Sequence, residues 1–124
     1  MCLDELFDLN LRTNIGYKVL YKLPKVEGYS PPFKNTHIVL KKDEWVEDPE
    51  KSKIYNKYKT GFHIFTEFGG AIYYLKYGKF ERCNKSRRCH AIYKVEFSDI
   101  TATGIQFDYG CVVARKIKVL EECV

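Results

Sequence analysis

The last third of the sequence constrains the fold most, because apolar and polar residues alternate along it in successive runs. Residues 91–98, 101–107 and 111–120 all have the alternation that is typical of β-strands. Between the last two runs, Asp108-Tyr109-Gly110 consists of residues that favour tight turns. The sequence therefore predicts a strand over residues 91–98, followed by a β-hairpin over residues 101–120.

The earlier part of the chain predicts shorter strands. Alternation predicts strands over residues 15–23 and 62–65, and short apolar runs predict a pair of strands over residues 37–40 and 44–47. Residues 49–59 are polar and rich in lysine, and we expect them to form an irregular connection. Together with the C-terminal runs, these segments amount to about six strands.

Two stretches space their apolar residues as a helix does. One covers residues 3–9, and the other follows Thr66, whose hydroxyl can cap it, and ends near Lys76. The connections between strands are too short and too rarely helical for a parallel sheet. We therefore predict an α+β fold with a curved, mostly antiparallel sheet of about five to seven strands and one or two short helices.

Length and composition favour one folded domain inside a cell. With 124 residues, 45% of them hydrophobic, the chain can close a single core. We expect one domain over residues 1–124, with a helical or extended arm at residues 1–14 and the α+β core at residues 15–120. No apolar run is long enough to span a membrane, and the acidic N-terminus lacks the features of a signal peptide. We therefore expect a cytoplasmic protein that has no membrane partner and whose five cysteines are reduced.

Charged residues are separated along the sequence. Residues 43–50, the acidic stretch, contain five carboxylates and no base, whereas residues 76–94, the basic stretch, have a net charge of +6. A chain with this separation would orient itself in the electric field of a partner; the alternative is that both stretches are solvated loops. The single tryptophan, Trp45, lies in the acidic stretch, and we expect it to anchor the core rather than form a contact surface.

The basic stretch is the best candidate for a binding surface. Arginine pairs with phosphate through two hydrogen bonds, and aromatic rings stack on unpaired bases. Arginine and tyrosine also dominate protein–protein hot spots, so composition does not separate a nucleic-acid partner from a protein partner. The acidic stretch would be repelled by phosphates, which argues against a plain nucleic-acid coat. The candidate contact residues are Lys79, Arg82, Lys85, Arg87 and Arg88 for charge, with Tyr74, Tyr77 and Phe80 for apolar contact.

The same stretch contains residues that could hold a zinc ion. Cys83 and Cys89 are followed directly by His90, and tetrahedral zinc takes thiolate and imidazole ligands. The spacing differs from the paired Cys-x2–4-Cys pattern of zinc knuckles, so we expect unliganded thiols and no cofactor. A zinc-stapled interaction domain remains an alternative, as does a Cys83–Cys89 disulfide under oxidising conditions.

Histidines offer the one route to catalysis that the sequence suggests. Metal-free cleavage or transfer at a phosphate needs an acid and a base near neutrality, together with a cation for the phosphoryl oxygens. His63 and His90, with Lys94 or Arg88 as the cation, have the required chemistry. A histidine among aromatic residues is more often a packing residue. No phosphate-binding glycine loop, paired-carboxylate motif or nucleophile elbow is present.

Three segments carry a resemblance to known proteins: Gly16-Tyr17-Lys18-Val19, Gly61-Phe62-His63-Ile64-Phe65 and residues 113–120, Val-Ala-Arg-Lys-Ile-Lys-Val-Leu. Their order resembles that in small uncharacterised proteins encoded by phages and prophages. The resemblance covers most of the chain from residue 16 onward and supplies no catalytic residues. It implies an accessory protein of a mobile element in a bacterial host, such as an anti-CRISPR protein. Many anti-CRISPR proteins are acidic and imitate DNA, whereas this chain has a net charge of +5.

We therefore expect a non-enzymatic binding module. Its basic stretch would dock on a host protein, on a nucleoprotein complex or on nucleic acid, which is how a host-directed inhibitor of the anti-CRISPR kind would act. The alternatives are a small metal-free nuclease or nucleotide transferase that uses His63, and the zinc-stapled domain.

Overall fold

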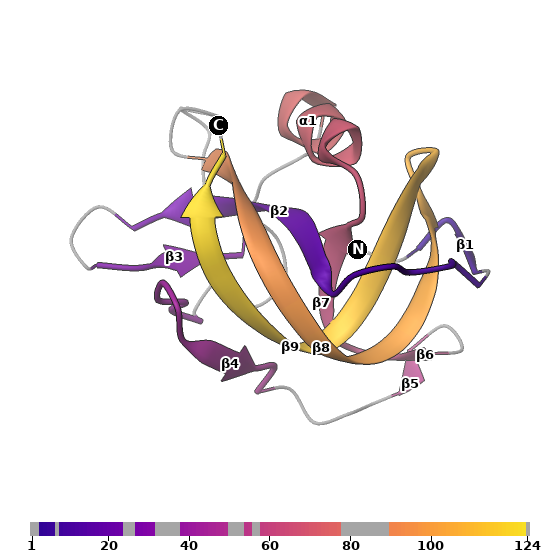
Figure 1. Cartoon of the computed structure of the whole chain (residues 1–124), viewed down its shortest axis with the longest axis horizontal. Coiled ribbons are helices and arrows are strands. Elements are labelled where there is room, and N and C mark those ends of the chain that lie inside the picture. Colours follow the sequence, from indigo (N-terminus) through magenta and orange to yellow (C-terminus); the bar gives the residue numbers. More distant parts are fainter. Residues whose placement is uncertain are drawn as a thin grey trace.

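The structure, a computed structural model, describes residues 3–6, 8–23, 27–31, 38–49, 54–55, 58–77 and 90–123. These residues form a seven-stranded sheet whose named strand pairs are all antiparallel, and helix α1 (Phe68–Tyr77) packs against it (Figure 1). This confirms the predicted mostly antiparallel sheet with a short helix, although the helical content is small. Among the described residues, no helix has the length and apolar character needed to cross a lipid bilayer.

The main sheet has the strand order β1-β8-β2-β7-β9-β4, and β3 pairs with the end of β2 at Tyr21 and Lys22. The bounds of its strands are β1 Glu5–Leu6, β2 Ile15–Lys22, β3 Tyr29–Ser30, β4 Trp45–Glu47, β7 Phe62–Phe65, β8 His90–Gln106 and β9 Tyr109–Glu122. Two further strands, β5 (Ile54–Tyr55) and β6 (Tyr58–Lys59), pair only with each other.

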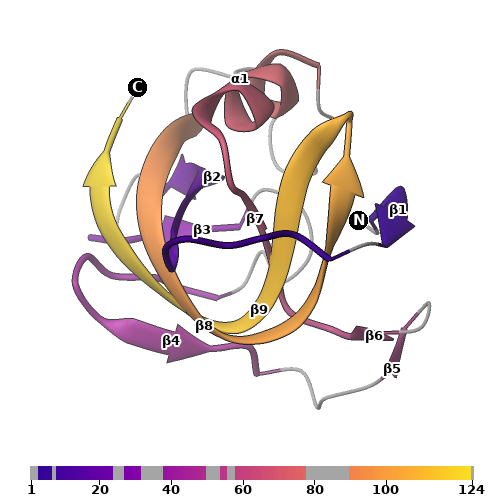
Figure 2. The same cartoon turned by 45° about the vertical axis from the view of Figure 1, so that its right-hand side comes forward.

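Strands β8 and β9 form one long hairpin on which the rest of the sheet is built. β8 pairs with β2 and then with β1, while β9 pairs with β7 and then with β4. β2 meets β7 where Tyr17 pairs with Phe65, so β8, β2, β7 and β9 close a circuit around an interior (Figures 1 and 2). The register of the hairpin shifts between Ile100 and Ala102, beside Asp99 with its φ of 58°. Such bulges bend a strand, and the two strands predicted over residues 91–107 are one curved strand.

The interior of this circuit contains the main hydrophobic core. A second core lies between the sheet and α1 and consists of Val19, Phe65, Ala71, Tyr74 and Ile92. Since β2 has the interior on one side and α1 on the other, both of its faces are covered. The main core consists of Leu20, Ile38, Leu40, Phe62, Ile64, Tyr93, Val95, Phe97, Val112, Ala114, Ile117 and Val119.

The predicted C-terminal hairpin is confirmed, but its turn lies at Phe107 and Asp108, since Tyr109 and Gly110 of the predicted turn belong to β9. Phe107 and Asp108 have φ of 51° and 66°, as a two-residue turn between twisted antiparallel strands requires. Phe107 is an unusual residue for this conformation, and its ring packs against Tyr73 and Tyr74 of α1, with centroid distances of 5.6 and 5.9 Å. Its backbone N–H donates to Asp4 Oδ2 at 2.8 Å. The turn is therefore held by both α1 and the N-terminal segment.

The predicted N-terminal helix is wrong. The described residues between 3 and 9 contain strand β1, in which Glu5 pairs with Ile105 and Leu6 with Gly104. The backbone N–H of Asp4 donates to the Ile105 carbonyl at 2.9 Å. The edge of β8 thus supplies hydrogen-bond partners for the backbone of this segment. A short isolated helix would have only its own weak hydrogen bonds.

The predicted pairing of residues 37–40 with residues 44–47 is also wrong. Leu40 bridges Tyr29, and β4 pairs with β9, so the two segments go to different neighbours. Trp45 does not anchor the core: 45% of it is exposed, and Lys118 Nζ lies 5.2 Å from the centre of its ring. Because side chains alternate along a strand, the inward position of Val46 turns Trp45 outward.

The predicted central helix is confirmed, but Thr66 does not cap it in the expected way. α1 begins at Phe68, and the Thr66 hydroxyl donates to the carbonyl of Gly110 at 3.3 Å. The Gly70 N–H is instead taken up by the Glu67 carbonyl at 3.1 Å. Within the predicted irregular connection over residues 49–59, the backbone forms the small β5–β6 hairpin.

Candidate functional site

Most of the basic stretch lies outside the described residues. This applies to the candidate contacts Lys79, Phe80, Arg82, Lys85, Arg87 and Arg88, and to the candidate zinc ligands Cys83 and Cys89. The structure does describe the two ends of the basic stretch, residues 76–77 at the end of α1 and residues 90–94 at the start of β8. The geometry on either side of residues 78–89 can therefore be built from these two ends.

The end of α1 presents aromatic rings to solvent. Tyr77 is 67% exposed, and its ring lies 4.8 Å from the ring of Tyr73, which is itself partly exposed. Tyr74, the other tyrosine that the sequence suggested as a contact, is 5% exposed and packs against Phe65 and Phe107. Helical spacing explains the difference, because Tyr73 and Tyr77 are four residues apart and share a face that Tyr74 does not. Tyr77 is thus accessible to a partner, whereas the ring of Tyr74 belongs to the core.

Charge is distributed unequally between the described residues and the rest of the chain. The described residues include 11 of the 21 Lys and Arg but 14 of the 16 Asp and Glu, a formal charge of −3. Since the whole chain has a charge of +5, the remaining residues contribute +8, of which residues 78–89 supply +4. The net positive charge of this protein therefore comes from residues outside the described ranges.

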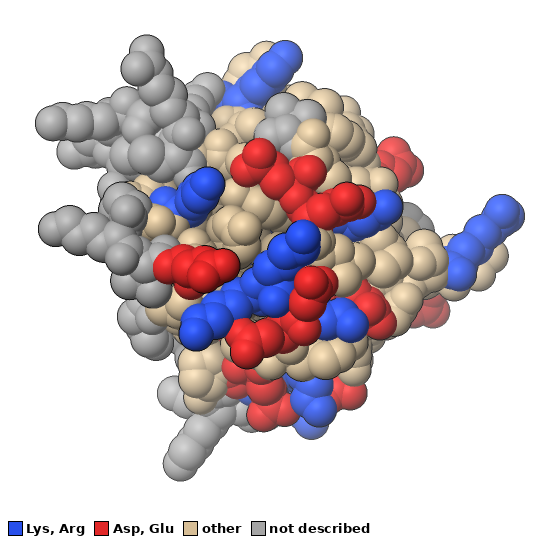
Figure 3. Space-filling view, turned by 60° about the vertical axis from the view of Figure 1, so that its left-hand side comes forward, with Lys and Arg blue, Asp and Glu red and all other residues tan. Residues whose placement is uncertain are grey.

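Basic side chains on the outer side of β8 and β9 are compensated locally. Lys118 lies 3.3 Å from Glu96, and Lys116 lies 3.4 Å from Asp99. On the face that Figure 3 shows, Lys and Arg side chains lie among Asp and Glu side chains and do not gather into a patch of one sign. This face has the mixed surface that keeps a protein soluble rather than a cationic surface for phosphate.

The structure does not bring the two candidate catalytic histidines together. His63 lies on β7 and His90 on β8, on either side of β2, so about two strand spacings, or roughly 10 Å, separate their strands. His90 is 4% exposed and packs against the ring of Tyr21, with centroids 5.2 Å apart. Lys94, the candidate cation, lies 3.7 Å from Glu121. Of the other candidate cation, Arg88, the structure describes nothing.

Metal ligands are not assembled within the described ranges. No group of three or more His, Cys, Asp or Glu side chains there is arranged to hold a metal ion, and Cys83 and Cys89 fall outside those ranges. Cys111 is buried on β9, and burial raises the pKa of its thiol from 9.0 to about 12. It is therefore a protonated core residue at neutral pH, whereas Cys123 is exposed near the end of the chain.

Lys18 is a buried cation that sequence reasoning missed. It is 8% exposed, and its Nζ donates to the His63 carbonyl at 2.8 Å. Burial lowers its pKa from 10.5 to about 8, and the negative charge of Asp48 opposes this shift. The alternating pattern placed Lys18 on the other face of β2 from Tyr17 and Val19. It did not indicate that this second face is covered as well.

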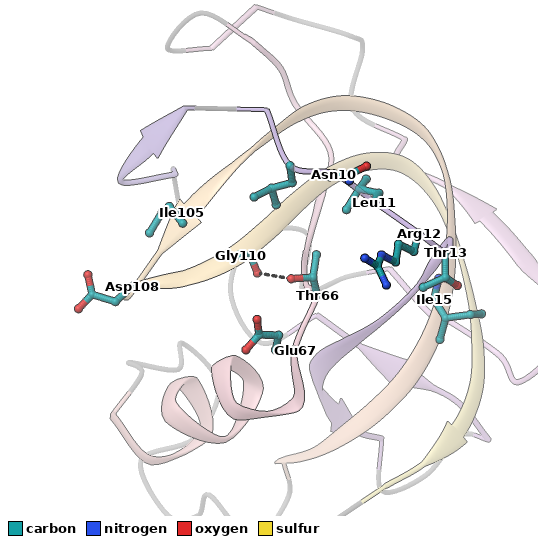
Figure 4. Close-up of a pocket in the computed structure, with 11 residues that line it drawn as sticks. Asn10, Leu11, Arg12, Thr13, Ile15, Thr66, Glu67, Ile105, Asp108 and Gly110 are labelled. Atoms are coloured by element: carbon teal, nitrogen blue, oxygen red, sulfur yellow. Dashed lines mark hydrogen bonds between the residues drawn. The ribbon is translucent and has the colours of Figure 1, made fainter.

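A hollow at one end of the barrel-like circuit is the clearest concave site among the described residues. It has a volume of about 490 Å³ and lies between residues 9–13, the start of α1 and the tip of the β8–β9 hairpin (Figure 4). Leu9 crosses this end with its N–H bonded to Thr103 Oγ1 at 3.2 Å. Ligand sites are common in the mouths of β-barrels, and this volume suits a small organic molecule.

The walls of the hollow combine apolar and charged side chains. Leu9, Leu11 and Ile105 supply apolar surface, and Arg12 and Glu67 supply charge. Sequence analysis singled out none of them as a site, because they come from three distant segments with no shared motif. The full lining is Leu9, Asn10, Leu11, Arg12, Thr13, Ile15, Thr66, Glu67, Ile105, Asp108 and Gly110.

No protein-family model matches this chain, and no curated protein or solved structure shows significant similarity to it. Its function therefore has to be argued from the residues and their geometry.

Proposed function

We propose that this protein is a non-enzymatic binding module that docks its basic stretch on an anionic surface of a host nucleoprotein complex or of nucleic acid. The resemblance to phage and prophage proteins supports an accessory protein of a mobile element, which would serve as a host-directed inhibitor of the anti-CRISPR kind. The observation that carries the proposal is the charge separation. The described body has a charge of −3, and residues 78–89 alone contribute +4.

Two further observations support this proposal. Tyr77 is 67% exposed and directly precedes residues 78–89 in the sequence, and tyrosine and arginine are both common in binding hot spots. The described lysines of β8 and β9 are already paired with carboxylates, so they contribute little uncompensated positive charge. Residues 78–89 then carry half of the +8 that lies outside the described residues, and a body of net negative charge would turn them toward an anionic partner.

A charge-reversal experiment tests this proposal. The double variant Arg87→Glu/Arg88→Glu is compared with Lys41→Glu/Lys42→Glu, which makes the same change in net charge at two exposed residues. Each protein is used to capture partners from a bacterial lysate, with and without nuclease treatment. We expect the first variant to lose capture and the second to retain it, with both melting within a few degrees of the wild type. Equal capture by all three proteins would refute the proposal.

The same preparations separate the alternative functions. Turnover of RNA, DNA or a nicotinamide dinucleotide by the wild type, and its loss in His63→Ala, would indicate an enzyme instead. One zinc ion per chain in protein purified without added metal, lost in Cys83→Ser, would indicate the zinc-stapled domain. Nuclease treatment during capture distinguishes a protein partner from a nucleic-acid partner.

A further inference from the structure

We propose that the exposed face of α1 binds single-stranded nucleic acid, with unpaired bases lying on the rings of Tyr73 and Tyr77. This inference rests on the function proposed above and narrows it, because it names the class of anionic partner and adds a surface from the described part of the chain. The surface, called here the tyrosine face, consists of Ile72, Tyr73, Lys76 and Tyr77.

The tyrosine face is the side of α1 that points away from the sheet. Its four residues follow one another at spacings of three and four, which place side chains on the same side of a helix. All four are exposed, whereas Tyr74 between them is buried. Figures 1 and 2 show α1 at the rim of the molecule, with no described element covering its outer side. A partner therefore has access to the second half of the helix.

The two tyrosine rings form a platform that is partly fixed before binding. Tyr73 is 39% exposed, and its ring contacts those of Phe107 and Tyr109, with centroid distances of 5.6 and 6.1 Å. The ring of Tyr77 lies 4.8 Å from that of Tyr73, and the residue is 67% exposed. A ring held by neighbours loses little conformational freedom on binding, so Tyr73 offers a prepared surface for a base, and Tyr77 extends it.

The charges on and beside the tyrosine face suit a phosphate backbone. Lys76, in the last turn, is the one charged residue of α1. Residues 78–89, which follow in the chain, add a charge of +4. The exposed carboxylates Glu67 and Asp108 lie before the first turn and at the tip of the β8–β9 hairpin. Positive charge and ring surface thus coincide toward the C-terminal end of α1, as in proteins that bind single strands.

The type of apolar surface favours unpaired bases over other anionic partners. In a duplex the faces of the bases are stacked on each other, so a ring can use them only after costly unstacking. A lipid surface is bound by helices whose apolar face is rich in large hydrophobic side chains, whereas Ile72 is the one exposed large aliphatic residue of α1. Stacking on aromatic rings needs only the face of a base, which every unpaired nucleotide presents.

Fluorescence anisotropy with labelled strands of about 16 nucleotides tests this inference on the full chain. The probes are oligo-dT, oligo-U, an abasic strand of the same length, and a duplex. The abasic strand keeps the phosphates and lacks the bases. We expect oligo-dT, oligo-U or both to bind at least roughly tenfold more tightly than the abasic strand at physiological salt. The tighter of the two identifies DNA or RNA as the source of the single strand.

Variants of the tyrosine face locate the contacts. Tyr73→Leu and Tyr77→Leu should each weaken binding of the preferred strand roughly tenfold and leave the abasic strand unchanged. Ile72→Ala, on the same face but without a ring, should change neither. Because Tyr77 is 67% exposed, its replacement should not affect folding, so loss of binding in that variant reports on the contact itself.

The outcomes separate this inference from the function on which it rests. Equal affinity for the base-containing and abasic strands, or no effect of Tyr77→Leu, would overturn the tyrosine face. The proposed function would survive that result if Arg87→Glu/Arg88→Glu still abolished binding, and it would fail if that double variant bound as the wild type does. Absence of binding to every probe would overturn the inference. So would nuclease-resistant capture of a protein that is lost in both Tyr77→Leu and Ile72→Ala, since this result would assign the face to a protein partner.

Discussion

Replacing Lys18 by methionine should stabilise this protein at neutral pH. Lys18 lies in the covered interior with its Nζ bonded to the His63 carbonyl, and burial lowers its pKa from 10.5 to about 8. A lysine with a lowered pKa is charged at pH 7 in both the folded and the unfolded protein, but its charge is better solvated in the unfolded chain. Methionine has a similar length and no charge, so it removes that penalty.

The magnitude follows from the pKa. One pKa unit corresponds to about 1.4 kcal/mol, so the fall from 10.5 to about 8 corresponds to about 3 kcal/mol of lost stability at pH 7. Methionine leaves the His63 carbonyl without its donor, which costs about 1 kcal/mol. We therefore expect Lys18→Met to raise the free energy of unfolding by about 2 kcal/mol at pH 7.

The sign of the pH dependence gives an independent check. Between pH 8 and pH 10.5 the unfolded chain keeps a proton on Lys18 that the folded protein has lost, so stability rises with pH in that range. Cys111 acts in the opposite direction above pH 9, because its thiol ionises there in the unfolded chain but only near pH 12 in the folded protein. Because part of the Cys111 thiol already ionises in the unfolded chain below pH 9, the net rise between pH 8 and 9 should be roughly half a kcal/mol, and it should level off above pH 9.

Urea denaturation followed by far-UV circular dichroism at pH 7, 8 and 9 measures both effects. The matched control is Lys22→Met on the same strand, where the side chain is exposed and the change should be within about 0.5 kcal/mol. Wild type and Lys22→Met should become more stable between pH 8 and 9, and Lys18→Met should not. A Lys18→Met variant less stable than the wild type at pH 7, or a wild type with no rise between pH 8 and 9, would refute the reasoning.

Two further substitutions test contacts that hold the sheet together. Asp48→Ala removes a carboxylate that is 1% exposed and lies 3.6 Å from Arg115, and breaking a buried pair on one side should cost about 3 kcal/mol in urea denaturation. The same change at exposed Asp8 should cost under about 1 kcal/mol, and equal losses would contradict the assigned burial. The free energy of unfolding of Phe107→Gly should exceed that of Phe107→Ala by about 1 kcal/mol. Both variants lose the ring, but only glycine adopts the φ of 51° without backbone strain. A more stable alanine variant would show that this conformation is not strained.

Prediction from the sequence succeeded where strands with alternating apolar and polar residues are joined by a local turn. The β8–β9 hairpin could be predicted because its strands are neighbours in the chain and each has apolar residues at every second position. The predicted start of α1 was close to the observed one for a similar reason, because the spacing of glycines and aromatic residues changes near Thr66. In both cases the information lies within a few residues of the element itself.

Prediction failed where a distant partner decided the outcome. Residues 3–9 have helical spacing, but the edge of β8 offers their backbone a strand partner about a hundred residues away. Trp45 was expected inside because it is large, but the register of β4 on β9 turns it outward. The hollow could not be predicted for the same reason, since its lining residues come from three segments that are brought together only when the hairpin tip returns to the start of α1.

The dominance of the β8–β9 hairpin has a consequence for biosynthesis. Strands β1, β2, β4 and β7 take most of their main-chain partners from residues that follow position 89, so the segments that leave the ribosome first have few partners when they emerge. The nascent chain must stay open until the hairpin has been translated, and then collapse in one cooperative event. Shortening the gene so that β9 is lost should therefore yield an insoluble or rapidly degraded product, rather than a smaller folded protein.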